Sequence, residues 1–355
     1  MNQKTMKALI YTAPNQIELQ DIPVPTLKHP TDAIVKVTVS TICGSDLHVI
    51  GGHLGIPTPV VMGHEFCGEV IEVGSAVGEF AVGDRVAVSC VASCGVCENC
   101  RNGQPVHCLK EDSGCFGVSP LLDGAQAEYC RIPYADNTMY HIPEDMSYEQ
   151  ALFVGDILST GYFGAEKADI HPGDSVLVMG AGPVGMCAAN TARLFGPGQI
   201  IMVDTVQERL DACLENGIAD VVINAKQVNV LERVKELTNG RGVDRSIEAV
   251  GTESTMISCM EAVRVGGNVS LLGVFSAPVT IPMHQFWIRN LTLNSGFVPV
   301  DHIPEMLRLL QHGKLKTDFL ITHRAPLNDV VKGYDYFKNK KDGCIKWLIT
   351  PYEHK

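Results

Sequence analysis

The chain has 355 residues, of which 45% are hydrophobic and 19% are charged, and its formal net charge is −12. This composition is that of ordinary globular proteins and excludes a disordered, collagenous or coiled-coil chain. The length predicts two domains, because single hydrophobic cores stop growing near about 250–300 residues. Only 28 residues are Lys or Arg. The acidic balance argues against nucleic acid as the main partner, because phosphate binding relies on clustered basic side chains.

The first twenty residues lack the apolar core of a secretory signal. The most apolar stretch, 176–189, contains glycines and a proline and is shorter than the roughly 20 residues that a membrane span needs. We therefore expect a cytoplasmic protein with no membrane partner, whose 13 cysteines are reduced. Metal binding or catalysis then competes with simple packing as the reason for so many cysteines.

The first 150 residues predict short strands separated by Gly, Pro and Asp, at 33–41, 69–73 and 85–88. Such strands favour a distorted barrel or sandwich over a parallel sheet. From about residue 153 the pattern becomes an alternation of strands and helices, which predicts a doubly wound parallel sheet. The predicted strands are 175–179, 199–204, 221–223, 243–250 and 268–272; the predicted helices are one ending near 195, then 207–216, 230–237 and 254–265.

The end of the chain loses this alternation and predicts an amphipathic helix at 303–311 and a strand within 344–350. We expect this segment to complete the first domain. The predicted domains are therefore a discontinuous one, residues 1–155 with 298–355, and a second one inserted into it, residues 156–297.

A G-x-G-x-x-G fingerprint lies between the predicted strand 175–179 and a helix. Its first glycine permits a tight turn, the second lets a pyrophosphate approach the backbone, and the third allows close helix–strand packing. The helix N-terminus offers N–H groups to the phosphates. The alternative is a glycine-rich turn without a ligand. The predicted cofactor-binding residues of this loop are Gly180, Gly182, Pro183, Val184 and Gly185.

Asp204 ends the next predicted strand, nineteen residues after the last of these glycines. A carboxylate at this position accepts hydrogen bonds from the adenosine ribose and repels a 2′-phosphate, which favours NAD(H) over NADP(H). Thr205, the next residue, is also predicted to bind the cofactor. Arg209 lies five residues further on, where a guanidinium either flanks the adenine or accommodates a phosphate.

Cys94, Cys97, Cys100 and Cys108 follow the spacing C-x2-C-x2-C-x7-C. Four thiolates so close in sequence suit one closed tetrahedral Zn²⁺ site with a structural role. A ferredoxin-type iron–sulfur motif would end in C-x3-C-P, and the last gap here is longer. Disulfides conflict with a reducing compartment, and coincidence is the remaining alternative. We predict a structural zinc.

A second group of potential metal ligands is scattered along the chain, with Cys43 in one segment and His64 in another. A thiolate and an imidazole suit zinc, and a third protein ligand would leave one position open for substrate. A single Cys or His is more often a packing residue. Spacing alone neither joins these two residues nor identifies the third ligand.

Residues 63–77 read Gly63-His64-Glu65-Phe-Cys-Gly68-(five residues)-Gly74-x-x-Val77. This segment resembles the zinc signature of the zinc-containing medium-chain alcohol dehydrogenases, and the four-cysteine loop and the glycine fingerprint follow in that family's order. The resemblance covers essentially the whole chain and is nearest the formaldehyde, secondary-alcohol and butanediol dehydrogenase branches. It implies an α/β fold with a GroES-like distorted β-barrel catalytic domain and a Rossmann doubly wound parallel-sheet cofactor domain.

The resemblance also implies roles for individual residues. Cys43, His64 and Asp156 would hold the catalytic zinc, and Glu65 would enter its coordination transiently. Other branches have Cys at position 156, whereas formaldehyde and secondary-alcohol branches have Asp. Asp46 would orient His64. The remaining implied roles are a proton relay (Ser45, His48), contacts to the cofactor (Thr160, Val250, Gly251, Val274, Phe275) and the lining of the substrate cleft (Cys90, Phe116, Phe297).

We therefore expect an enzyme that transfers hydride reversibly between NAD(H) and a secondary alcohol or ketone. It would carry two zinc ions per chain and form a homo-oligomer, a tetramer rather than a dimer. Diols, hydroxysteroids and formaldehyde remain alternative substrates, although the chain lacks room for the long extra loop of formaldehyde-dismutating enzymes. A zinc-free reductase relative and a zinc-ribbon binding module are the alternatives of other classes.

Overall fold

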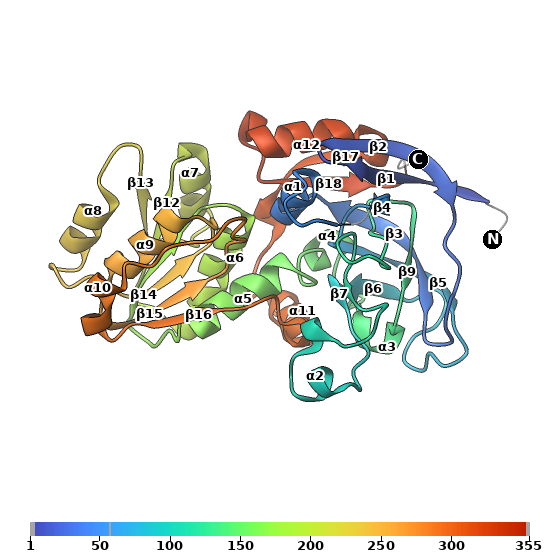
Figure 1. Cartoon of the computed structure of the whole chain (residues 1–355), viewed down its shortest axis with the longest axis horizontal. Coiled ribbons are helices and arrows are strands. Elements are labelled where there is room, and N and C mark those ends of the chain that lie inside the picture. The colour runs from blue at the N-terminus through green and yellow to red at the C-terminus, as the bar shows by residue number, and fades with distance from the viewer. Residues whose placement is uncertain (1–3, 57, 353–355) are drawn as a thin grey trace. The chain divides into compact units, whose positions relative to one another are not determined.

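The computed structural model describes residues 4–56 and 58–352. The chain divides into two compact units, Met1–Ser159 with Pro299–Lys355 and Thr160–Val298 (Figure 1). The first boundary differs slightly from the predicted one, so that Asp156 belongs to the first unit rather than to the inserted one. Among the described residues, no helix combines the length and the apolar character needed to cross a membrane.

The first unit is built on a seven-stranded sheet with the order β10-β6-β5-β3-β18-β17, in which β9 also pairs with β3. Most of its pairs are antiparallel, and only β17 and β18 run parallel. The last strand of the chain, β18, thus lies in the interior of this sheet. The strands are β3 (Ala33–Thr41), β5 (Phe66–Val73), β6 (Arg85–Val88), β9 (Tyr129–Ile132), β10 (Met139–His141), β17 (Ile321–Pro326) and β18 (Lys346–Thr350).

Two small sheets complete the strands of this unit, and short helices connect them. The small sheets contain β1 (Thr5–Ala13), β2 (Gln16–Pro23) and β4 (Val60–Val61), and β7 (Val91–Ala92) and β8 (Gly114–Cys115). The helices are α1 (Gly44–Ile50), α2 (Glu98–Arg101), α3 (Ala135–Thr138), α4 (Tyr148–Ala151), α11 (Ile303–Gln311) and α12 (Val330–Asn339). Helix α12, which the sequence did not predict, packs against β2, β17 and β18 (Figure 1).

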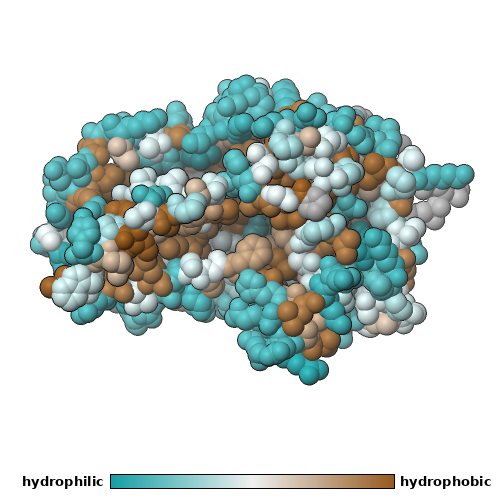
Figure 2. Space-filling model, in the orientation of Figure 1, coloured by the Kyte–Doolittle hydropathy of each residue, from teal (hydrophilic) through white to brown (hydrophobic). Residues whose placement is uncertain are grey.

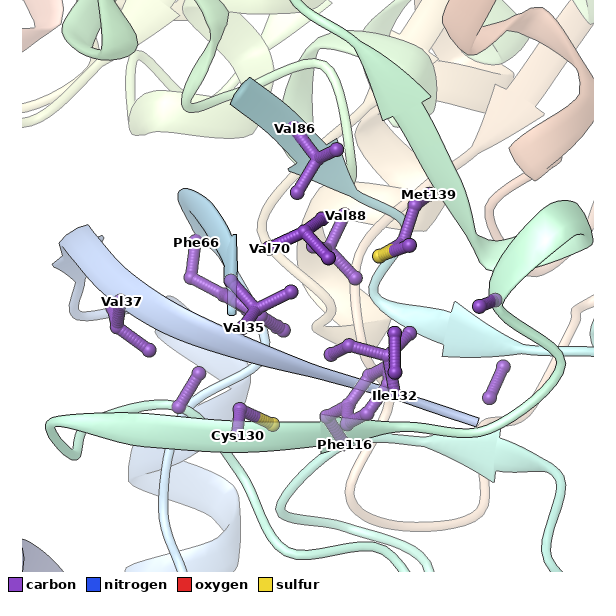
Figure 3. Close-up of a cluster of buried hydrophobic side chains, with 14 of the residues drawn as sticks. Val35, Val37, Phe66, Val70, Val86, Val88, Phe116, Cys130, Ile132 and Met139 are labelled. Carbon is purple, nitrogen blue, oxygen red and sulfur yellow. The ribbon is translucent and has the colours of Figure 1, made fainter. Parts of the chain in front are cut away.

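The core of the sheet comes from alternate residues of neighbouring strands, as expected where one face of each strand is buried. Figure 3 shows Val35 of β3, Val70 of β5 and Val88 of β6 gathered in one cluster with Phe116 and Met139. Each such side chain stabilises the fold by about 1.5–3 kcal/mol through burial. This core supports the strand ends and loops that carry the potential metal ligands.

The second unit is a six-stranded parallel sheet with the order β13-β12-β11-β14-β15-β16, and helices connect its strands. This confirms the predicted α/β class. Strands β11 and β12 match the predicted limits. The strands are β11 (Ser175–Met179), β12 (Gln199–Asp204), β13 (Val221–Asn224), β14 (Val243–Glu248), β15 (Val263–Leu271) and β16 (Thr292–Ser295); the helices are α5 (Ile157–Lys167), α6 (Pro183–Ala192), α7 (Gln207–Glu215), α8 (Val230–Leu237), α9 (Glu253–Ala262) and α10 (Met283–Phe286).

Several predicted boundaries in this unit differ from the structure: the predicted strand 243–250 ends at Glu248, and the largest shift lies between α9 and β15. Helix α9 ends at Ala262 instead of residue 265, and β15 begins at Val263. The β-branched residues Val263 and Val265 favour extended backbone. Gly266 has a positive φ of 69°, which a helix does not contain.

Candidate metal centres and cofactor site

Three side chains from distant parts of the sequence meet in the first unit. Cys43 directly precedes α1, His64 precedes β5, and Asp156 precedes α5. One ligand atom from each lies within 4.8 Å of the other two. The Asp156 carboxylate oxygen Oδ2 is 3.5 Å from Cys43 Sγ and 3.3 Å from His64 Nε2. The fold thus brings together the set that spacing could not join.

Asp46 lies behind two of these ligands and is fully buried. Its Oδ2 accepts a hydrogen bond of 2.9 Å from the backbone N–H of Cys43, and its Oδ1 lies 3.4 Å from His64 Nδ1. The latter contact directs the other ring nitrogen of His64, Nε2, toward Asp156. A carboxylate in this position fixes the orientation of a ligating histidine.

Glu65 carries a buried carboxyl group beside the same cluster. Its Oε2 accepts a hydrogen bond from the Lys346 ammonium, which also donates to the Ile42 carbonyl at 3.0 Å. Its Oε1 has no hydrogen-bond partner among the described residues. Burial raises the pKa of Glu65 to about 7, although the charge of Lys346 opposes this shift. The sequence analysis gave Lys346 no role, yet a lysine within the apolar run 344–350 was a signal for a buried ion pair.

These groups fit a zinc ion. Thiolate, imidazole and carboxylate are the three kinds of side chain that zinc binds, and atoms about 2.0–2.3 Å from one ion are necessarily within about 4.6 Å of each other. The unpartnered Oε1 of Glu65 adds a further oxygen in a buried position. Cys43, His64 and Asp156 are therefore the residues that would hold such an ion, with Glu65 beside them.

The four cysteines of the C-x2-C-x2-C-x7-C segment also converge. Their sulfur atoms all lie within 4.8 Å of one another, with 3.4 Å between Cys97 and Cys100 and 3.9 Å between Cys97 and Cys108. Backbone N–H groups of Cys94 and Cys97 donate to sulfur atoms of the cluster at 3.3 Å. Backbone hydrogen bonds from Leu109 and Cys100 lower the pKa of the Cys97 thiol to about 6. An arrangement of four thiols, one of them easily ionised, fits a closed zinc site.

All 13 cysteines lie in the described ranges, and none of them forms a disulfide. Cys90 is 1% exposed. Phe116, which the resemblance placed in the substrate cleft, is fully buried and packs edge-on against Phe66 with ring centroids 5.5 Å apart. The cleft-lining role of Phe116 stays a prediction, as does that of Cys90. Phe297 of the second unit is 50% exposed.

Ser45 and His48 lie three residues apart on α1, a spacing that places them on one face of a helix. The Ser45 hydroxyl is 3.0 Å from His64 Nε2, beside the proposed ligand atoms. Burial and the nearby His53 lower the pKa of His48 below its usual value. His48 is thus neutral at pH 7 and able to accept a proton.

The glycine fingerprint turns from β11 into α6 in the second unit. Gly180 has a φ of 104°, and a Cβ atom there would lie 2.6 Å from a methyl group of Val250. A Cβ on Gly185 would lie 1.7 Å from the Gly180 carbonyl oxygen. Both positions therefore require glycine. Gly182 is the N-cap of α6, with Pro183 and Val184 in its first turn.

Asp204, at the end of β12, faces this loop. Its Oδ2 accepts a hydrogen bond of 2.7 Å from the Ala181 N–H, and its Oδ1 accepts one of 2.7 Å from the Thr205 N–H. A Cβ on Gly182 would lie 3.8 Å from a guanidinium nitrogen of Arg209. The predicted adenosine-binding residues therefore meet at one edge of the sheet.

The loops after β14 and β15 lie against the glycine loop and against each other. Gly251 has a φ of 86°, and a Cβ there would lie 2.4 Å from the Val274 carbonyl oxygen. Phe275 packs partly buried against the hydrophobic core of this unit. Thr160 lies in the same unit, on α5.

Glu248 is a buried carboxylate in this region that the sequence analysis missed. It accepts hydrogen bonds from the Val250 and Gly251 N–H groups at 2.9 and 3.0 Å and from the Thr255 hydroxyl at 2.7 Å. Strand β14 also carries Asp244, Arg245 and Ser246, so its sequence does not distinguish Glu248 from a polar residue that faces solvent.

Comparison with known proteins identifies the family of this chain. Residues 29–144 match the family model described as alcohol dehydrogenase GroES-like domain, and residues 183–312 match that described as zinc-binding dehydrogenase. An alcohol dehydrogenase of Cupriavidus necator is 36% identical and covers 98% of this chain and 99% of its own. A sorbitol dehydrogenase of Bacillus subtilis is 32% identical over 98% of both chains.

Among solved structures, a zinc-dependent alcohol dehydrogenase 2 from Streptococcus superposes with a TM-score of 0.92 at 39% identity, covering 99% of both chains. Matches of this extent agree with the zinc signature, the four-cysteine loop and the glycine fingerprint. The chain belongs to the zinc-dependent medium-chain alcohol dehydrogenase family, with a GroES-like domain and a Rossmann-like parallel sheet.

Proposed function

We propose that this protein oxidises a secondary alcohol to a ketone, reversibly, with NAD⁺ as the hydride acceptor. The observation that carries the proposal is the buried cluster of Cys43, His64 and Asp156, whose ligand atoms lie within 4.8 Å of one another. A zinc ion bound by these residues supplies Lewis acidity to a substrate oxygen. The cofactor supplies the hydride chemistry, and the protein supplies orientation and electrostatics.

The protein's own residues would handle the proton. Ser45 lies beside the ligand atoms, 3.0 Å from His64 Nε2, and its hydroxyl can accept a proton from the alcohol while passing its own on. His48, neutral at pH 7 because burial lowers its pKa, receives that proton from the same face of α1. Partly exposed, His48 would release it to solvent.

The preference for NAD(H) is supported by Asp204. Hydrogen bonds from the backbone N–H groups of Ala181 and Thr205 hold its carboxylate at the edge of the glycine loop. A negative charge fixed there would repel the 2′-phosphate of NADP(H) and accept the ribose hydroxyls of NAD(H). Arg209 would flank the adenosine.

The secondary alcohol is supported by the third ligand and by relatives. Asp156 stands where other branches of the family have Cys, and the related sorbitol dehydrogenase is named for a polyol substrate. Two zinc ions per chain are proposed, one at each of the two clusters of ligand atoms. Thirteen free thiols suit a reducing compartment, so we propose a cytoplasmic location.

The proposal is tested with a panel of short secondary alcohols, diols, primary alcohols, aldehydes and hydroxysteroids, assayed in both directions with NAD(H) and NADP(H). We expect the highest kcat/KM for a secondary alcohol with NAD⁺. Highest activity on primary alcohols or formaldehyde would overturn the substrate class, and no turnover at two bound zinc ions would overturn the activity.

Asp204→Gly is the companion variant for cofactor choice. Removing the carboxylate should raise kcat/KM for NADP⁺ relative to NAD⁺ by at least about tenfold, since one such contact is worth about 1.4 kcal/mol or more. An unchanged ratio of the two kcat/KM values would show that Asp204 does not determine the preference between NAD⁺ and NADP⁺. The exposed Asp21→Gly is the matched control.

A further inference from the structure

A buried chain of polar side chains leads from α12 to the metal ligand His64. The Tyr334 hydroxyl donates a hydrogen bond of 2.8 Å to Gln126 Oε1. Gln126 Nε2 donates to Asp46 Oδ2 at 3.2 Å and to the Thr41 carbonyl at 3.0 Å. Gln126 is 0% exposed and Tyr334 is 5% exposed. Neither residue has a role in the proton transfer or metal binding described above.

The direction of these hydrogen bonds is determined by chemistry. An amide oxygen only accepts, so Tyr334 must donate to it, and this contact fixes which end of the Gln126 amide faces Asp46. The Asp46 Oδ2 atom then receives two donors, Gln126 Nε2 and the Cys43 N–H. The carboxylate is thereby held with Oδ1 toward His64 Nδ1, at an ion-pair distance of 3.4 Å; that nitrogen has no hydrogen-bond partner among the described residues.

Gln126 also packs against the backbone that carries His64. Gly63, the residue before His64, has a φ of 95°, and a Cβ there would lie 2.5 Å from Gln126 Cγ and 2.9 Å from the Gln126 backbone nitrogen. The Gln126 N–H also donates a hydrogen bond of 2.8 Å to the carbonyl of Met62, the residue before Gly63. One residue therefore supports His64 from its backbone side and, through Asp46, from its ring.

We propose that Gln126 and Tyr334 are positioning residues, which hold Asp46 and through it His64 in the orientation that binds the catalytic metal. Without the Gln126 amide, Asp46 loses a donor that fixes its rotamer, and His64 Nδ1 loses a fixed acceptor. Groups that orient a metal ligand typically contribute 10–100-fold to metal affinity or activity. The inference rests on the proposed metal role of Cys43, His64 and Asp156.

The test measures zinc retention rather than turnover. Wild type, Gln126→Leu, Tyr334→Phe and the double variant, each isolated with its zinc, are titrated with a chromogenic chelator, and the zinc remaining is counted. We expect the catalytic zinc to be bound at least about tenfold more weakly in Gln126→Leu and several-fold more weakly in Tyr334→Phe, with the four-cysteine zinc unchanged. Because both residues act on Asp46, the loss in the double variant should be smaller than the product of the single losses.

Tyr140→Phe is the matched control. It also removes a hydroxyl that donates one hydrogen bond, 3.2 Å to the Val300 carbonyl, in the same unit but outside this chain of side chains. Equal zinc retention in Tyr334→Phe, Tyr140→Phe and wild type would overturn the inference, as would multiplicative losses in the double variant. If Gln126→Leu does not fold, the isosteric Tyr334→Phe still decides the question. A wild-type protein that binds only the four-cysteine zinc would instead overturn the proposed function.

Discussion

The side chain that most defines the proposed metal site is Asp156, a carboxylate beside a thiol and an imidazole. Its Oδ2 is the atom that both Cys43 and His64 approach, at 3.5 and 3.3 Å. Burial alone would raise the pKa of Asp156, but the hydrogen bond with His64 lowers it, so the side chain is ionised at neutral pH. A carboxylate in place of a thiolate makes the ligand set harder and less prone to oxidation.

Asp156→Ala should abolish turnover while leaving cofactor binding intact. Two ligands hold zinc far less tightly than three, and we expect kcat/KM to fall more than about 100-fold and the zinc content to fall from two ions to one. Zinc is counted by metal analysis, and NADH binding is followed by fluorescence quenching. The exposed Asp21→Ala serves as the control. Retained turnover would contradict the assignment of Asp156 as a ligand.

How much of the site was predictable depends on how its residues are spread along the sequence. The four cysteines lie within one loop, so their spacing alone predicts a shared ion. Cys43, His64 and Asp156 meet only through tertiary folding, and only a family resemblance could join them. Gln126 and Glu248 gave no signal, because a polar residue that is buried with a partner looks in sequence like one that faces water. Lys346 differs from them, since it lies within the apolar run 344–350.

At the level of elements, the strands were the most predictable part of the fold. The runs that became β3, β6, β11 and β12 are rich in β-branched residues and end at turn residues, so local sequence and tertiary structure agree. Helix α5 was missed because its glycines weaken the helical pattern, and α12 contains a glycine in its interior as well, Gly333.

The parallel sheet contains an element whose stability should depend on pH. Asp244 on β14 is 4% exposed and accepts hydrogen bonds from the Arg264 Nε atom at 2.7 Å and from the Ser175 N–H and hydroxyl at 2.9 and 2.8 Å. Burial alone would raise its pKa, but these hydrogen bonds hold the pKa well below the usual range. The ionised Asp244 carboxylate on β14 therefore stabilises the pairing with β11 through its hydrogen bonds with Ser175.

Asp244→Asn should destabilise the protein at pH 7 by about 2–3 kcal/mol, since it loses charge-assisted hydrogen bonds. Because the folded-state pKa is lowered, this stabilisation is present above the unfolded-state value of about 3.9 and is lost as the pH falls toward the folded-state value. The gap between wild type and variant should therefore shrink below about pH 4. Urea unfolding at several pH values measures it, with Asp21→Asn as control. A constant gap down to pH 2.5 would contradict this account.

At the level of the whole molecule, the second unit presents a surface suited to self-association. Strand β16 is the edge of the parallel sheet, and the short helix before it exposes Trp287 by 70% and Ile288 by 67%. Figure 2 shows hydrophobic surface in the region of α10, close to this edge. An open strand edge flanked by large apolar side chains favours pairing with a second copy. This supports the proposed homo-oligomer.

The double variant Trp287→Glu with Ile288→Asp should dissociate the oligomer, because each subunit would bring two buried charges into the interface. Light scattering coupled to size-exclusion chromatography should give a tetramer for wild type and a lower mass for the variant. Val82→Glu, at a residue of the first unit that is 64% exposed, should leave the mass unchanged. A monomeric wild type, or a variant of unchanged mass, would contradict the assembly.

The interior position of β18 has a consequence for how the protein is made. This strand, Lys346–Thr350, lies between β3 and β17 and is synthesised after the other strands that the structure describes. The parallel sheet of residues 160–298 is complete in sequence well before then, and domains generally fold as units during synthesis. The inserted unit is therefore free to fold first. The sheet of the first unit cannot be completed until β18 is available to pair with β3 and β17. Nascent chains that stop short of residue 346 would contain a folded parallel-sheet unit, but the sheet beside Cys43, His64 and Asp156 would lack β18.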